Sequence, residues 1–189
     1  MDRYHIALFI HIVALVVAAS ATAVTKLAAG RRARARTVAE VLDWHGVLTS
    51  ASKLFPICLA AFVITGFYML SITHVAIWST GFVVAGLAGV TLLLVSGVFL
   101  GTKGKALTQV LEEIAKRGAD QPAPKLVPPP LITALPVINT GIALSVVFDM
   151  VTKPTSVPVA LSIVAVGIVL SAVAAIRGSP PATDTVRAT

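Results

Sequence analysis

The chain has 189 residues, of which 57% are hydrophobic and only 12% are charged, and its formal net charge is +7. A soluble domain of ordinary composition is about 25% charged, so this chain has too few polar side chains to cover a water-exposed surface. The composition therefore excludes an ordinary soluble domain and predicts an integral membrane protein, whose apolar side chains contact lipid.

Five apolar runs are long enough to cross a bilayer, which takes about 20 residues in a helix. They cover approximately residues 5–29, 47–72, 77–100, 131–150 and 157–176. We therefore expect an all-α helical membrane bundle of five transmembrane helices within residues 1–177, followed by a disordered tail, residues 178–189. The second run has two candidate beginnings, Val47 or Leu54. Four spans are the alternative if the polar-spotted residues 131–150 do not cross completely.

Basic residues predict the orientation, because lysine and arginine collect in cytoplasmic loops. The stretch GRRARAR, residues 30–36, follows the first run, and further basic clusters follow the third and fifth runs, whereas the other side holds only Arg3 and Lys153. The N-terminus is therefore expected outside and the C-terminus in the cytoplasm. We interpret the arginines as an orientation signal beside anionic lipid, and nucleic acid is not expected as a partner.

The first run is interpreted as an uncleaved anchor, because the strong positive charge follows it rather than precedes it. Ala19 and Ala21 give an A-x-A pattern, so a cleaved signal peptide is the alternative. The Ala-, Val- and Arg-rich composition indicates a bacterial cytoplasmic membrane.

Residues 102–118 are expected to continue the third span as an amphipathic helix that ends at Gly118. Glu112 and Lys116 are spaced as an i,i+4 ion pair. This helix is interpreted either as lying on the inner membrane surface or as docking a partner. The proline-rich residues 119–130 are expected to form a stiff, extended connector.

Small residues recur every four positions, which favours close packing of helices in lipid. The sets are Gly97 with Gly101, then Gly81, Ala85 and Gly89, and finally Ala14, Ala18 and Thr22. We expect these faces to meet other spans of the same chain. Association of two chains through the Gly97–Gly101 face, as a homo-oligomer, is the alternative.

The predicted topology gathers several polar side chains in the outer half of the membrane, where each needs a partner or a role. His11, Tyr68, Ser145 and Asp149 lie at compatible depths, and His74 follows the second run. Four interpretations are open: haem ligation by His11 and His74, copper or another metal at the same histidines, a His–Asp proton relay, and hydrogen bonds from His11 that join the helices.

Asn139 and Thr140 lie near the middle of the fourth run, after Pro136. Proline removes a helix hydrogen bond and frees a carbonyl, and broken helices with polar residues at mid-membrane occur at transporter sites. A kinked packing helix and a small solute transporter are both consistent with this pattern.

The stretches FIHIVAL in the first run, LFPICLAAFVITGFYML in the second and FDMVTKP before the last resemble a bacterial family of predicted integral membrane proteins, domain of unknown function 2269. That resemblance implies a small helical bundle and no established activity. A fainter likeness connects the early histidine of the first run with copper-resistance membrane proteins of the D type, although the Trp-x-Gly-Gly sequence expected after that histidine is absent.

Nucleophile-elbow, phosphate-loop and HExxH motifs do not occur. We therefore expect a non-enzymatic accessory or scaffold protein that associates with lipid, and with a membrane protein partner or a second copy. The alternatives are a haem-, copper- or proton-handling protein that uses the outer-half histidines, and a small transporter.

Overall fold

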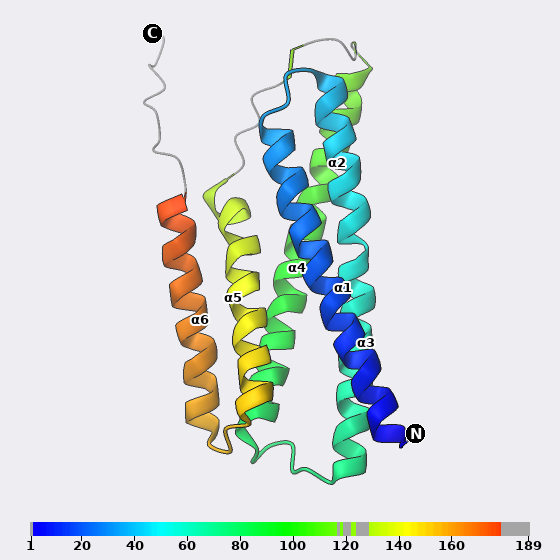
Figure 1. The fold of residues 1–189 in the computed structure, drawn as a ribbon. Coiled ribbons are helices and arrows are strands. Elements are labelled where there is room, and N and C mark those ends of the chain that lie inside the picture. The colour runs from blue at the N-terminus through cyan, green and yellow to red at the C-terminus, as the bar shows by residue number, and fades with distance from the viewer. Residues whose placement is uncertain (1, 117, 119–121, 124–128, 179–189) are drawn as a thin grey trace. The chain divides into compact units, whose positions relative to one another are not determined.

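The computed structural model describes residues 2–116, 118, 122–123 and 129–178, which contain six α-helices and no β-strand (Figure 1). The all-α prediction is therefore confirmed. The helices are α1 (Arg3–Ala33), α2 (Val38–Ser52), α3 (Leu54–Thr73), α4 (Gly81–Ala115), α5 (Pro130–Thr152) and α6 (Val157–Gly178). Five helical segments of this part of the chain are long and apolar enough to cross a membrane, with α2 and α3 together as one, as expected of an integral membrane protein.

The helices form two compact units. The first unit contains Met1–Ile77 and Leu94–Val127, and therefore α1, α2, α3 and the C-terminal part of α4. The second unit contains Trp78–Leu93 and Pro128–Thr189, and therefore the beginning of α4 with α5 and α6. Each unit has its own packing and is described separately.

In the first unit, the second apolar run is divided between two helices at Lys53. Proline has no N–H and its ring clashes with the carbonyl four residues earlier, so Pro56 cannot continue the helix ladder to Ser52. Lys53 instead donates its backbone N–H to the carbonyl of Ser50 at 3.3 Å. Of the two candidate beginnings of the second span, the helix boundary coincides with Leu54.

The seam along which α1 packs beside α2 and α3 repeats every seven residues (Figure 1). Its buried members are alanines, Ala7, Ala14, Ala21 and Ala28. His11, Ala18 and Thr25 fall four residues after the first three alanines and are half-buried. Intervals of four and three residues alternate along this face, as they do along the face of a coiled coil. The small side chains let the helix backbones approach closely. The predicted four-residue repeat through Ala14, Ala18 and Thr22 describes this seam incompletely.

A tight turn between α1 and α2 is stabilised by the sequence TVAE. Thr37 begins α2 by accepting the backbone N–H of Glu40 at 3.3 Å, and the Glu40 carboxylate accepts the backbone N–H of Arg36 at 2.7 Å. Together these bonds resemble a capping box, which satisfies N–H groups that a helix start leaves free. The turn thus fixes where α2 begins.

The C-terminal part of α4 continues without a break to Ala115, as expected for the amphipathic extension. Leu111 is fully buried there whereas Val110 is 51% exposed, so one face of this extension packs within the first unit. Lys116 forms its ion pair with Glu113, at 2.9 Å, and not with Glu112 as predicted. Gly118 adopts a φ of 138° just beyond the helix, in the region that favours glycine.

In the second unit, glycines mark the close approaches between helices. A β-carbon at Gly89 would meet Val146 of α5, and one at Gly167 would meet Ser145. The predicted small face of Gly81, Ala85 and Gly89 therefore packs within the chain. A β-carbon at Gly97 or Gly101 meets nothing within 4 Å among the described residues, so the packing of this face against another span or a second chain stays a prediction.

Candidate functional site

Among the predicted site residues of the first unit, His11 forms a side-chain hydrogen bond to another transmembrane helix in the described part of the chain. Its Nδ1 lies 2.8 Å from the hydroxyl oxygen of Thr65 on α3, and that hydroxyl donates to the carbonyl of Ala61 at 2.6 Å. When the Thr65 hydroxyl donates to Ala61, it accepts from His11, whose proton is then on Nδ1. The ring also packs edge-on against Phe62 at 4.9 Å. His11 therefore joins two helices, as one of its four interpretations expects.

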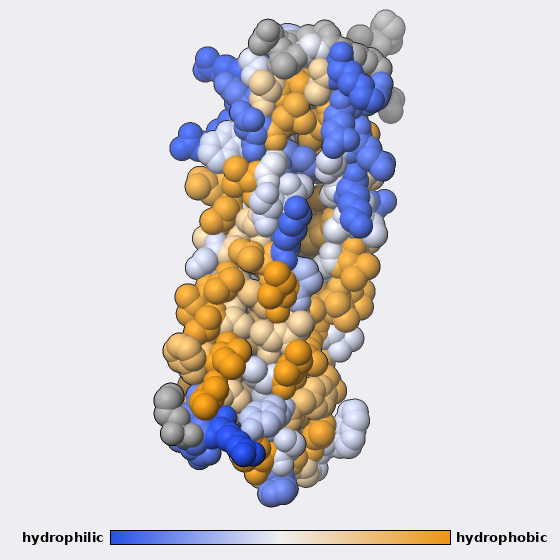
Figure 2. Space-filling model, turned by 90° about the vertical axis from the view of Figure 1, so that its right-hand side faces the viewer, coloured by the Kyte–Doolittle hydropathy of each residue, from blue (hydrophilic) through white to orange (hydrophobic). Residues whose placement is uncertain are grey.

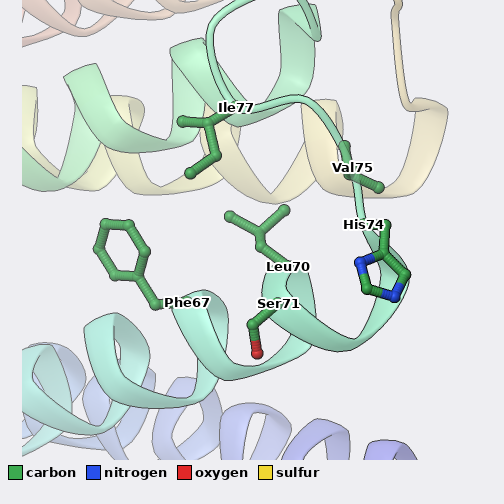
Figure 3. A pocket seen from close by; sticks show the side chains of 6 residues that line it. All are labelled: Phe67, Leu70, Ser71, His74, Val75 and Ile77. Carbon is green, nitrogen blue, oxygen red and sulfur yellow. The ribbon is translucent and has the colours of Figure 1, made fainter.

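His74 ends α3 in the left-handed conformation, with a φ of 52°, and is one of the residues that line a pocket of about 360 Å³ (Figure 3). The pocket wall is mostly apolar and comes from Phe67, Leu70, Ser71, Val75 and Ile77. The hydroxyl of Ser71 already donates to the backbone carbonyl of Tyr68. Tyr68 itself is 40% exposed and is not part of this wall.

The structure does not bring His11 and His74 together. His11 bonds Thr65, which lies nine residues before His74 on the same helix, a separation of about 13 Å along the axis at 1.5 Å per residue. Ligands of one metal ion lie about 2 Å from it. Among the described residues, no group of three or more His, Cys, Asp or Glu side chains is placed to hold a metal ion.

A second histidine, His45 on α2, is almost completely buried, with 4% of its surface exposed. Its Nδ1 lies 3.0 Å from a guanidinium nitrogen of Arg32 on α1, and its Nε2 lies 2.8 Å from the hydroxyl oxygen of Thr108 on α4. That hydroxyl donates to the carbonyl of Gly104 at 3.0 Å. One imidazole thus connects three helices of the first unit.

The donor and acceptor roles in this cluster are determined by chemistry. A guanidinium can only donate, so Nδ1 of His45 accepts from Arg32 and carries no proton. The ring is therefore neutral with its proton on Nε2, from which it donates to Thr108. Protonation of Nδ1 would replace the bond to Arg32 with the repulsion of two cations. We call Arg32, His45 and Thr108 the polar relay.

Little in the sequence indicates the polar relay, and His45 is not among the predicted site residues. One signal was present: Arg32 lies four residues after Ala28 and so continues the spacing of the α1 seam. His45 lies 13 positions after Arg32, and Thr108 lies a further 63 positions along the chain, and no local pattern predicts such a meeting.

The remaining members of the predicted outer-half pocket, Ser145 and Asp149, belong to the second unit, whereas His11 and Tyr68 belong to the first. Ser145 and Asp149 share one face of α5, as their spacing predicts, and both are buried. Asp149 has no exposed surface, and neither carboxylate oxygen has a hydrogen-bond partner in the described part of the chain. A pocket common to all four residues stays a prediction.

The predicted mid-membrane site lies within α5, which contains Pro136. The hydroxyl of Thr140 donates to the carbonyl of Pro136 at 2.8 Å, and Asn139 is likewise engaged by another group. The Thr140 hydroxyl is thus used within its own helix. Its bond is to the carbonyl of the proline that lies inside α5. The interpretation of α5 as part of a transport site stays a prediction.

The chain was compared with known families, curated proteins and solved structures. No family model matches the chain, and no curated protein or solved structure is significantly similar to it. The resemblance to the bacterial family of unknown function, and the fainter one to copper-resistance proteins, therefore stay predictions.

Proposed function

We propose that the protein is a non-enzymatic accessory or scaffold protein of the membrane, and that an end of the first unit projecting from the bilayer binds its partner. The observation that carries this proposal is the polar relay, which joins α1, α2 and α4 through one buried imidazole. A relay with both ring nitrogens of His45 engaged has a structural role, because it leaves no nitrogen for a ligand.

The lengths of the helices support a projecting end. The hydrocarbon core is about 30 Å thick, which about 20 helical residues span, and α5 and α6 have 23 and 22 residues. By contrast, α1 has 31 residues and α4 has 35. α3 alone has the 20 residues of a full span, so α2 is additional.

Charged residues indicate where the projecting end begins. Lys26 interrupts the apolar part of α1, Lys53 lies between α2 and α3, and Lys103 follows the apolar part of α4. We define the projecting end as Lys26–Ala33, α2 and Lys103–Ala115. Figure 2 shows hydrophilic side chains gathered at the end that carries the α1–α2 turn, and hydrophobic ones over the middle of the same face.

The surface of the projecting end suits a protein partner. Arg31 lies over the ring of Trp44, with its guanidinium carbon 5.9 Å from the ring centroid, which joins α1 to α2 beside the polar relay. Val110 of α4 is 51% exposed, and Glu113 follows it one helical turn later. We propose Val110 as the contact point to test, because a charge placed there would disturb an apolar contact with a partner.

Purification from native membranes tests the proposal. We expect a partner in stoichiometric amount, retained by the His11→Ala variant and reduced at least about tenfold, or 1.4 kcal/mol, by Val110→Glu. The His11 change tests the first unit away from the projecting end, whereas the Val110 change adds charge to its surface. A haem absorption band or stoichiometric copper in the purified protein, lost in His11→Ala, would contradict the proposal and favour the cofactor interpretation.

The proposed orientation places the projecting end in the cytoplasm of a bacterial cell, with the N-terminus outside and the C-terminus inside. This orientation is supported by the basic residues at the projecting end, which outnumber those on the other side of the membrane, Arg3 and Lys153. A Cys58→Ser background removes the single cysteine, so that new cysteines report alone. In intact cells we expect a membrane-impermeant maleimide to label Thr155→Cys, and to label Ala35→Cys only after permeabilisation. Labelling of Ala35→Cys in intact cells, and of Thr155→Cys only after permeabilisation, would show that the orientation is the opposite of the one proposed.

A further inference from the structure

The second unit contains an isolated carboxyl group. Asp149 has no exposed surface, and both its oxygens are buried without a hydrogen-bond partner among the described residues. Buried polar groups are nearly always paired, and an unpaired carboxylate in an apolar membrane region is strongly disfavoured. The group therefore needs either a bound ligand or a neutral form.

Helix geometry shows where Asp149 points. At 100° per residue, it lies about 40° from Ser145 and about 20° from Ile142 around α5, between their two directions. Ser145 faces Gly167 of α6, whereas Ile142 lies near Gly89 of α4. Asp149 is therefore directed into the wedge between α4 and α6, where Ala85, Ala160 and Val164 form the apolar core of this unit.

No titratable group faces Asp149 from the helices packed around it. The part of α4 in this unit, Gly81–Leu93, contains no ionisable residue, and neither does α6 before Arg177 at its far end. On α5, Asp149 is the sole ionisable residue. Lys153 follows one turn later, but its side chain is exposed and, among the described residues, no ion pair joins it to Asp149.

A metal ion is a poor fit to this site. Hard cations take several oxygen ligands, and the carbonyls of the turn next to the site are already used. Those of Pro154 and Thr155 accept the backbone N–H groups of Phe82 and Gly81, at 3.0 and 2.9 Å. A single carboxyl in an apolar wedge suits a proton better than any larger cation.

We propose that Asp149 is a proton-binding site, which the closed α4–α5–α6 unit holds as the neutral acid and which releases its proton when the unit opens to water. The nearest opening is the turn after α5, because Asp149 lies one helical turn before that helix ends at Thr152. The two backbone bonds from α4 to Pro154 and Thr155 keep this turn closed. This site is independent of the projecting end and of its proposed partner.

Dicyclohexylcarbodiimide tests the protonation state directly. This apolar reagent reacts with a protonated carboxylic acid: the acid proton moves to a carbodiimide nitrogen, the carboxyl oxygen bonds to the central carbon, and rearrangement gives a stable N-acylurea. Exposed carboxyl groups titrate near pH 4. At about pH 8 they are ionised and unreactive, so we expect peptide mass spectrometry of the full chain to find the label on Asp149.

A matched pair of variants and a second reagent complete the test. We expect Asp149→Asn to abolish labelling and Glu113→Gln, at an exposed ion-paired acid, to leave it unchanged. A water-soluble carbodiimide should label Asp149 at least tenfold more slowly than the apolar reagent does. Absence of label from Asp149 in the wild-type protein, or equal rates with both reagents, would overturn the proposal, and this result does not depend on whether a variant folds.

Discussion

Gly81→Ala is expected to destabilise the second unit by about 3 kcal/mol, at the upper end of the cost of overpacking. A β-carbon at this position would lie 2.5 Å from the carbonyl oxygen of Ser156 and 2.6 Å from that of Pro154. Both are backbone atoms of the turn before α6, so no side-chain rotation relieves the clash. Detergent-induced unfolding, followed by circular dichroism, measures the loss.

Gly97→Ala is the matched control, and its effect should have the opposite sign. A β-carbon there meets nothing within 4 Å, and alanine is favoured over glycine inside a helix by roughly 0.5–1 kcal/mol. Equal destabilisation by the two changes would mean that the close approach of Gly81 to the turn is not a feature of the folded protein.

His45→Ala is expected to destabilise the first unit by about 3 kcal/mol. The change removes both bonds of the polar relay and leaves the half-buried guanidinium of Arg32 without its acceptor. Breaking a buried network that contains a charge is among the more costly single changes. The same unfolding experiment measures the effect.

A double-mutant cycle with Thr108→Val separates the two bonds of His45. If Thr108 acts only through His45, the two changes together should cost less than the sum of their separate effects. His5→Ala is the control, because His5 is exposed and its one ion pair given for the described chain, with Asp2, spans 4.0 Å. Additive effects of His45 and Thr108 would show that the relay does not act as a unit.

The number and approximate place of the membrane helices could be predicted, because a run of about 20 apolar residues has few alternatives to a spanning helix. The boundaries were less certain where local chemistry intervenes. Residues 77–80 were assigned to the third span but lie before α4, whose first N–H groups bond the turn before α6. At Lys53, Pro56 explains a division that hydropathy alone left open.

The α1 seam could not be predicted from hydropathy. Its alanines recur every seven residues, but α1 contains many other small apolar residues. The buried alanines therefore cannot be distinguished from the exposed ones by hydropathy. The glycine pairs show the same difficulty: Gly81 and Gly97 are each part of a four-residue repeat, but only Gly81 of the two faces another segment in the described structure. Which face is packed depends on neighbours distant in sequence.

The surroundings of the candidate polar residues depend in the same way on distant parts of the chain. The shared face of Asp149 and Ser145 follows from helical spacing. The isolation of its carboxyl group depends on the apolar sequences of α4 and α6, which surround it only after folding. His45 was passed over because its partners come from two other helices.

The interruption at Lys53 has a mechanical consequence. A helix that lacks one ladder bond bends more easily than an intact one, so a force applied to α2 reaches α3 only weakly through the backbone that joins them. The same force reaches α1 and α4 directly through the imidazole of His45. A protein that pushed on α2 would therefore move those two helices first, and the backbone at Pro56 would act as the compliant joint.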